Sequence, residues 1–272
     1  MTYKMIVLDL DDTLLRDDHT ISDRTKNALM AAQEQGVKVV LASGRPTFGM
    51  NNIAEELKLH EYGSYILSFN GAKIIDAKTS EEHFSSTLSP EMVHRLYELS
   101  QAEGVGIHTY VNDWIITENE HPFTLKEGEI TGLPIKKVTS FVDSVIAPVV
   151  KVLMVEDPEK LIKVEEKLKQ EFKGTLSIMR SKPYFLEFLE EGVTKGSSLN
   201  ALIQTLGIKR EEVIAMGDSY NDLAMIEFAG LGVAMGNAPE DIKEAADYVT
   251  DSNMNDGVAM VVEEFILAKV AK

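Results

Sequence analysis

Carboxylate side chains alternate where the first apolar run of the chain ends. Met5–Leu8 is short, apolar and rich in strand-forming residues, and Asp9, Asp11 and Thr13 follow it at alternate positions. A carboxylate at the end of a buried strand is costly unless a cation or hydrogen bonds compensate its charge. We therefore interpret this acidic cluster as a site rather than as part of the scaffold.

Two further polar segments occupy comparable positions. Ser43 and Gly44 follow an apolar run over 37–42. A hydroxyl beside a free backbone N–H at a strand-to-helix turn is suited to phosphate. Lys195 stands at the expected start of a helix over 195–206, where the helix dipole opposes a cation. Its position therefore indicates a second role, such as neutralising a bound anion.

The most specific of these segments is 217–222, which reads GDSYND and follows the apolar run 213–216. Within it, Asp218 comes directly after an expected buried strand, as Asp9 does. Ligands of open α/β sheets bind outside the carboxyl ends of the strands. We therefore expect these polar segments to lie together at one edge of a sheet.

Single residues exclude two other motifs. A calcium loop of the EF-hand type that begins at Asp9 would need glycine where Leu14 stands and glutamate where Thr20 stands. The segment 195–197 lacks the Gly-Lys-Ser/Thr order of a P-loop.

Taken in order, the four segments resemble the motifs of the haloacid dehalogenase (HAD) superfamily of phosphoryl-transfer enzymes. The long gap between Ser43 and Lys195 is where one subgroup of that superfamily inserts an α+β cap. The segments Phe69–Ala72, Pro183–Gly196 and Met216–Met225 are similar to Cof/YidA-type sugar phosphatases, and this similarity extends along nearly the whole chain.

The resemblance implies Mg²⁺-dependent hydrolysis of small phosphomonoesters, in particular sugar phosphates, through an aspartyl-phosphate intermediate. Asp9 would be the nucleophile, and Asp11 would protonate the leaving oxygen and then deprotonate the hydrolytic water. Lys195 would neutralise the phosphate and orient the nucleophile. The substrate-binding residues that the resemblance implies are Leu10, Ser43, Gly44, Lys195 and Asn221.

The implied metal ligands are the side chains of Asp9 and Asp218 and the main-chain carbonyl of Asp11. Carboxylates crowded beside a phosphate dianion repel one another, since two like charges about 4 Å apart cost about 4 kcal/mol at an effective dielectric of about 20. Mg²⁺ accepts a few carboxylates together with waters and phosphate, so it would relieve this repulsion. Asp222 is a further candidate, which would orient Lys195 or its own loop.

The cap is expected to choose the substrate. Closure of a cap excludes bulk water and completes a site of this kind. Tyr184 and Glu187 are candidates for substrate-selecting residues because they lie just upstream of Lys195 in the sequence.

Other activities of the superfamily are weighed by single features. A dehalogenase typically lacks the second acid, which is Asp11 here. A sugar phosphomutase keeps both acids but usually carries a different cap, placed right after the first motif. A non-catalytic phosphosugar sensor on the same fold is a further alternative, although every expected catalytic residue is present.

The elements that must position these residues alternate between strands and helices. This alternation at both ends of the chain predicts a parallel sheet with covering helices, whereas the middle mixes hairpins with helices. The predicted fold class is α/β, a Rossmann-like parallel-sheet HAD core with an inserted α+β cap. The expected domains are a first core part over 1–83, the cap over 84–193 and a second core part over 194–272. Single helices are expected over 47–59 and 256–269.

Composition limits the partners. The chain of 272 residues contains no cysteine, which excludes disulfides and thiolate chemistry. Its formal net charge of −17 argues against nucleic acid and anionic membranes, and no stretch is long enough to span a bilayer. With no targeting segment visible, we expect a cytoplasmic protein whose partner is a small-molecule phosphate ester. No oligomeric state is predicted.

Overall fold

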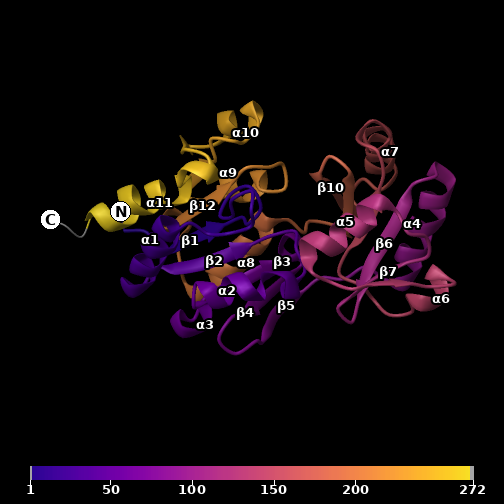
Figure 1. The fold of residues 1–272 in the computed structure, drawn as a ribbon, viewed down its shortest axis with the longest axis horizontal. Coiled ribbons are helices and arrows are strands. Elements are labelled where there is room, and N and C mark those ends of the chain that lie inside the picture. Colours follow the sequence, from indigo (N-terminus) through magenta and orange to yellow (C-terminus); the bar gives the residue numbers. More distant parts are fainter. Residues whose placement is uncertain (1, 270–272) are drawn as a thin grey trace. The chain divides into compact units, whose positions relative to one another are not determined.

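The computed structural model describes residues 2–269, which divide into two compact units. The first unit comprises residues 2–44, 50–84 and 194–269, and the second comprises Arg45–Gly49 and Ser85–Val193. The second unit therefore interrupts the first. The boundaries expected from the sequence, 83/84 and 193/194, assign Arg45–Gly49 to the core and Phe84 to the cap. In the structure Arg45–Gly49 belongs to the second unit and Phe84 to the first. Figure 1 shows both units as a ribbon coloured along the chain, with helices and strands labelled where there is room.

The first unit is built around an eight-stranded sheet. Its strands are β1 (Met5–Leu8), β2 (Lys38–Ala42), β3 (Tyr65–Ser68), β4 (Lys73–Asp76), β5 (Glu82–Ser85), β12 (Val213–Gly217), β13 (Leu231–Ala234) and β14 (Tyr248–Val249). Its helices are α1 (Asp23–Glu34), α2 (Asn51–Glu56), α3 (Leu59–Tyr62), α8 (Lys195–Leu206), α9 (Leu223–Phe228), α10 (Glu240–Ala245) and α11 (Gly257–Val261). The strand order is β14-β13-β12-β1-β2-β3-β4-β5, and the pairs from β14 to β3 are parallel.

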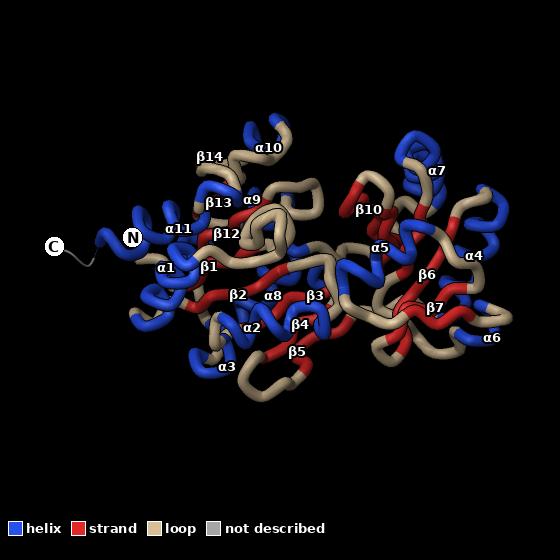
Figure 2. Tube along the Cα trace, in the orientation of Figure 1, coloured by secondary structure: helices blue, strands red, loops and turns tan. Residues whose placement is uncertain are grey.

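Helices cover this sheet on both faces, and the alternation of side chains along the strands decides which residue packs on which face. Ile6 and Leu8 of β1 belong to the core that α1 and α11 cover, whereas Met5 and Val7 belong to the core that α8 covers. All four are fully buried. A strand covered on both faces must be apolar throughout, which explains the uninterrupted run at 5–8. Figure 2 distinguishes the strands in red from the helices in blue.

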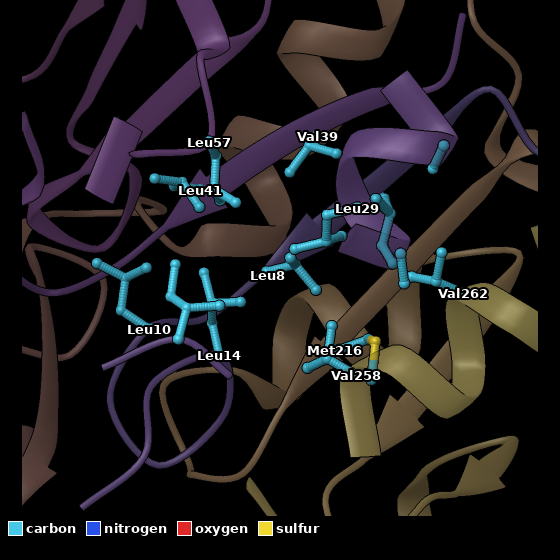
Figure 3. Packing of buried hydrophobic residues seen from close by; sticks show 14 of the residues in the cluster. Leu8, Leu10, Leu14, Leu29, Val39, Leu41, Leu57, Met216, Val258 and Val262 are labelled. Carbon is cyan, nitrogen blue, oxygen red and sulfur yellow. The ribbon is translucent and has the colours of Figure 1, made fainter. Parts of the chain in front are cut away.

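Figure 3 shows the first of these cores from close by. Leu8 of β1 and Met216 of β12 lie in one cluster with Leu29 of α1 and Val258 of α11. The cluster joins segments from the two ends of the chain, so the first unit depends on both.

The second unit contains a six-stranded sheet. Its strands are β6 (Gly106–Val111), β7 (Trp114–Thr117), β8 (Ile135–Lys137), β9 (Val152–Val155), β10 (Leu176–Lys182) and β11 (Phe185–Glu190), and its helices are α4 (Pro90–Glu103), α5 (Pro122–Thr131), α6 (Phe141–Ser144) and α7 (Pro158–Glu171). The order is β10-β11-β9-β6-β7-β8, with antiparallel pairs except for β7 and β8.

The side chains of β6 alternate between an apolar and a polar environment. Ile107 packs in the core formed with α4 and α7. His108 and Tyr110 are buried beside α5, where His108 contacts Thr124 and Tyr110 donates to the Glu127 carboxylate. The second unit therefore encloses a polar cluster as well as an apolar core.

The predicted fold class is confirmed by the parallel sheet with helices on both faces and by the inserted α+β unit. The prediction of a single helix over 47–59 is wrong. A 3₁₀ turn over Thr47–Met50 precedes α2, and Lys58, with a φ of 53°, interrupts the helical conformation between α2 and α3. A left-handed residue cannot continue a right-handed helix.

The C-terminal helix also differs from the prediction of one helix over 256–269. Asp256 has a φ of 61° and precedes α11, which passes into a π-helical segment over Val262–Ile266 and then a 3₁₀ turn over Leu267–Lys269. In the part of the chain that the structure describes, no helix is long and apolar enough to cross a membrane.

Candidate active site

Asp9 is the first residue after β1, which lies between β2 and β12. It is 5% exposed, and its main-chain N–H donates to the carbonyl of Met216 at 3.0 Å. The chain then turns, and the carbonyl of the fully buried Leu10 accepts from the N–H of Leu15 at 2.8 Å. Asp11 lies half-buried in this turn. The first acidic pair therefore stands at the carboxyl end of the central parallel strands.

Lys195 is the first residue of α8 and is fully buried. A capping box between Thr194 and Ser197 fixes the start of this helix. Nζ of Lys195 lies 2.5 Å from Oδ1 of Asp9 and 2.5 Å from Oδ1 of Asp222. Burial opposes the charge, but the two carboxylates outweigh it and hold the pKa of Lys195 above its ordinary value. They also supply the compensation that a cation at a helix N-terminus requires.

Asp222 is fully buried, and both of its carboxylate oxygens are engaged. Oδ1 faces Lys195, whereas Oδ2 accepts the main-chain N–H groups of Asp218 at 3.1 Å and Ser219 at 3.0 Å. A Cβ on Gly217 would lie 2.4 Å from the Cβ of Asp222, so close packing requires glycine there. Asp222 thus contacts both the lysine and the loop that carries Asp218.

Asp218 follows β12 and receives a hydrogen bond from the turn after β1. Oγ1 of Thr13 donates to Oδ1 of Asp218 at 2.8 Å. The sequence pattern had placed Thr13 beside the acidic pair without indicating this partner. The bond joins the first and last of the four polar segments, which are some two hundred positions apart in the chain.

The carboxylates of this site are crowded. One oxygen each of Asp9, Asp218 and Asp222 lie within 4.8 Å of one another. Burial, reinforced by the neighbouring carboxylates, raises the pKa of Asp9 to about 7 and that of Asp218 to about 9. The ammonium of Lys195 lowers the pKa of Asp9 but does not balance the cluster. These residues therefore fit a further, hard cation that would let the carboxylates ionise together.

The oxygens available to such a cation are not equivalent. Asp222 already faces Lys195 and two main-chain N–H groups, which leaves the side chains of Asp9 and Asp218 as the better ligands. Ligation by the main-chain carbonyl of Asp11 stays a prediction.

The segments expected to contact phosphate meet through Asn70, which belongs to the segment Phe69–Ala72 of the family resemblance but which the sequence did not assign to the site. Ser43 follows β2, is buried, and precedes the half-buried Gly44. The Ser43 carbonyl accepts from the N–H of Asn70 at 2.9 Å. Nδ2 of Asn221 donates to Oδ1 of Asn70 at 3.0 Å. Asn70 therefore touches two of the predicted site segments.

The two candidates for substrate selection belong to the second unit. Tyr184 stacks on Phe123 with ring centroids 4.5 Å apart. Glu187 is 2% exposed, and its Oε2 lies 3.1 Å from Nζ of Lys151. Both side chains therefore take part in packing within that unit, and their role in choosing a substrate stays a prediction.

Comparison with known proteins gives consistent results. A family model described as haloacid dehalogenase-like hydrolase matches residues 6–262. The solved structure of a haloacid dehalogenase-like hydrolase from Bacteroides thetaiotaomicron is 45% identical, with a TM-score of 0.89, and the match covers 97% of this chain and 100% of that one.

Two further relatives carry more specific names. The 5-amino-6-(5-phospho-D-ribitylamino)uracil phosphatase YcsE of Bacillus subtilis is 33% identical over 97% of this chain and 96% of its own length. The HAD subclass IIB sugar phosphatase BT4131 is 28% identical, with a TM-score of 0.83, over 96% of this chain and 98% of its own.

Proposed function

Because the chain belongs to the haloacid dehalogenase-like hydrolases, we propose that it is a Mg²⁺-dependent phosphatase of small phosphomonoesters, with sugar phosphates as its substrate class. One observation carries this proposal. The buried ammonium of Lys195 contacts Asp9 and Asp222 at once, and Asp218 stands beside them at the carboxyl end of the parallel strands. The arrangement concentrates charged groups at a place where a scaffold would need none.

The proposed reaction has two steps. In the first, a carboxylate oxygen of Asp9 attacks phosphorus, the bond from phosphorus to the ester oxygen breaks, and Asp11 gives a proton to the leaving alcohol. In the second, water attacks the phosphorus of the aspartyl-phosphate and gives a proton to Asp11, the bond from phosphorus to the Asp9 oxygen breaks, and inorganic phosphate leaves with both aspartates restored. The buried position of Asp9 and the half-buried position of Asp11 support these different roles.

The remaining residues bind and orient in this proposal. Lys195 favours the ionised form of Asp9 and would balance charge on the phosphate, while Asp222 holds the lysine in place. Ser43, Gly44 and Asn221 would donate to phosphate oxygens, and Leu10 would shape the turn beside them. Mg²⁺, held by Asp9, Asp218 and the carbonyl of Asp11, would neutralise charge on the transferring phosphoryl group.

The substrate class rests on the relatives. One is named for a phosphate ester of a ribityl chain and the other for sugar phosphates, so both names describe a phosphomonoester on a polyhydroxylated carbon chain. We propose the same class for this chain, with Tyr184 and Glu187 of the second unit as selecting residues. A cytoplasmic location is proposed from the sequence alone.

The test is phosphate release from a panel of phosphomonoesters, with Mg²⁺ or with EDTA, for the wild type and Asp9→Asn. We expect release that requires Mg²⁺ and falls by more than about 1,000-fold in Asp9→Asn, because the variant lacks the attacking carboxylate. Asp113→Asn, at an exposed turn of the second unit, is the matched control.

Trapping with acid should recover phosphate on the wild-type protein and none on Asp9→Asn. A folded wild type that releases no phosphate from any ester would overturn the proposal in favour of a sensor, and conversion between ester isomers would favour a mutase.

A further inference from the structure

The segment Phe69–Gly71 has an unusual backbone. Phe69 and Asn70 have φ angles of 53° and 57°, and Gly71 has a φ of 92°. A left-handed conformation is unfavourable for a bulky residue such as phenylalanine, and residues of this kind persist where the surrounding structure imposes them. Here the turn follows β3 at the same sheet edge as Ser43, and Asn70 is fully buried. The structure therefore holds this turn in place at a local cost.

The contacts of the turn reach three segments of the site. The main-chain N–H of Asn70 donates to the Ser43 carbonyl at 2.9 Å, and its side-chain Oδ1 accepts from Nδ2 of Asn221 at 3.0 Å. The carbonyl of Gly71 accepts from Oγ of Ser198 at 2.7 Å, in the first turn of the helix that begins with Lys195.

Close packing explains why glycine follows the asparagine. A Cβ on Gly71 would lie 2.5 Å from Oγ of Ser198 and 2.9 Å from the carbonyl oxygen of Thr194. No other residue could bring the turn this close to α8. The position of Asn70 relative to Asn221 is therefore set by main-chain packing and not by a flexible side chain alone.

We propose that Asn70 is a positioning residue that fixes the side-chain amide of Asn221 toward the phosphate of the substrate. A primary amide has a donor end and an acceptor end, and rotation about its last bond exchanges them. Because Oδ1 of Asn70 accepts one N–H of Asn221, the amino end of that amide is held in place and its second N–H is left to bind phosphate. This inference rests on the proposed phosphatase function, in which Asn221 binds phosphate.

The role requires asparagine in particular. Asparagine tolerates the left-handed backbone better than most residues, and it supplies a neutral acceptor. A carboxylate would also accept from Asn221 but would repel phosphate, whereas a residue without an acceptor would let the amide rotate.

The experiment is a double-mutant cycle of Asn70→Gly and Asn221→Ala. Glycine keeps the left-handed backbone and removes only the side chain. The readouts are kcat/KM for the best ester of the panel and, independently of turnover, the dissociation constant of inorganic phosphate in the presence of Mg²⁺. Asn112→Gly is the matched control, because Asn112 also has a positive φ, 49°, but lies exposed in the second unit.

We expect Asn70→Gly to lower kcat/KM and phosphate affinity about tenfold, the scale of one lost hydrogen bond. The same change in the Asn221→Ala background should cost less than about twofold, because the residue on which it acts is gone. Asn112→Gly should leave both quantities within about twofold. If Asn70→Gly does not fold, Asn70→Ser takes its place in the cycle, because serine also lacks the amide oxygen that accepts from Asn221.

Equal losses in both backgrounds would overturn the inference, since Asn70 would then act independently of Asn221. An active Asn70→Gly variant with unchanged phosphate affinity would overturn it as well. If the wild type binds inorganic phosphate but hydrolyses no ester, only the phosphatase proposal is overturned. The double-mutant cycle can then still be evaluated from the dissociation constants of inorganic phosphate. A wild type that does neither would overturn both.

Discussion

A single lysine serves two carboxylates in the first unit. Nζ of Lys195 contacts Asp9, the proposed nucleophile, and Asp222, which the proposed reaction leaves unchanged. Because it contacts both, the lysine links the nucleophile to the loop that carries Asp218, since the second oxygen of Asp222 accepts the main-chain N–H of that residue.

In the second unit, His108 is a buried imidazole with an unusual environment. Nδ1 lies 3.1 Å from Oγ1 of Thr124, and within the described residues Nε2 has no hydrogen-bond partner. Burial, followed by the charges of Lys151 and His121, lowers the pKa of His108 from 6.5 to about 3. The folded protein therefore keeps this imidazole neutral over most of the acid range.

From the lowered pKa of His108 we expect the free energy of unfolding to fall as the solution becomes more acidic. Between pH 6.5 and about 3 the unfolded chain binds a proton at His108 that the folded chain does not. The contribution of the neutral His108 to the free energy of unfolding is thus fully present above pH 6.5. It is lost as pH falls, at up to about 1.4 kcal/mol per pH unit. Urea unfolding of the wild type and His108→Gln at pH 7.5, 6.5, 5.5 and 4.5 measures it.

His108→Gln should show the shallower decline, while His60→Gln, at an exposed histidine of the first unit, should follow the wild type. Parallel curves for all three proteins would contradict the prediction.

At the scale of elements, the six-stranded sheet buries an ion pair. Lys151 precedes β9 and Glu187 lies on the neighbouring β11, with side chains 1% and 3% exposed. Breaking a buried pair by removing one partner leaves an uncompensated charge and typically costs about 3–5 kcal/mol. Replacing both partners by apolar residues of similar volume is often neutral.

We therefore expect Lys151→Met to destabilise the protein by about 3 kcal/mol and Lys151→Met with Glu187→Met to recover most of that loss, as measured by urea unfolding.

The relative rates of the double variant across the ester panel then distinguish a packing role of Glu187 from a role in substrate selection. A double variant with wild-type stability and an altered ranking of esters supports a selecting role for Glu187. An unchanged ranking assigns the residue to packing alone. A single variant as stable as the wild type would contradict the energetic argument.

Elements with strong local signals could be predicted from the sequence. The strand Met5–Leu8 and the helices Pro90–Glu103 and Lys195–Leu206 have an apolar run or a cap that marks their ends. The helix α5 gives no such signal, because its apolar residues follow no helical period, although Pro122 stands at its first turn.

The site shows the same division between local and distant information. Asp9 and Asp218 were predicted because each directly follows an apolar strand, and parallel strands bring their carboxyl ends together. The hydrogen bonds from Thr13 to Asp218 and from Asn221 to Asn70 could not be read from the sequence, because each joins residues more than 100 positions apart. Asn70-Gly71 signals a turn, but the left-handed φ of Phe69 depends on tertiary packing.

At the scale of the whole molecule, the formal net charge of −17 opposes the approach of an anionic ester. Salt screens this repulsion, with a Debye length near 10 Å at about 0.1 M ionic strength. We therefore expect kcat/KM for a dianionic phosphomonoester to rise by about two- to fivefold as NaCl increases from about 10 to 150 mM.

Melting temperatures over the same salt series control for changes in stability. A kcat/KM that falls with salt would show that local positive potential at the site outweighs the net charge of the molecule.

The interrupted path of the first unit has a consequence for synthesis on the ribosome. β1 pairs with β2, which follows it closely, but its other neighbour is β12, more than 200 residues later. Until Val213–Gly217 has emerged, a nascent chain carries one edge of Met5–Leu8, four residues that are fully buried in the finished protein, without its partner strand. An unpaired apolar strand edge is a template for aggregation. Slow translation of the segment 85–193 would lengthen that exposure, so the inserted unit sets how long the nascent first unit must be protected, for instance by a chaperone.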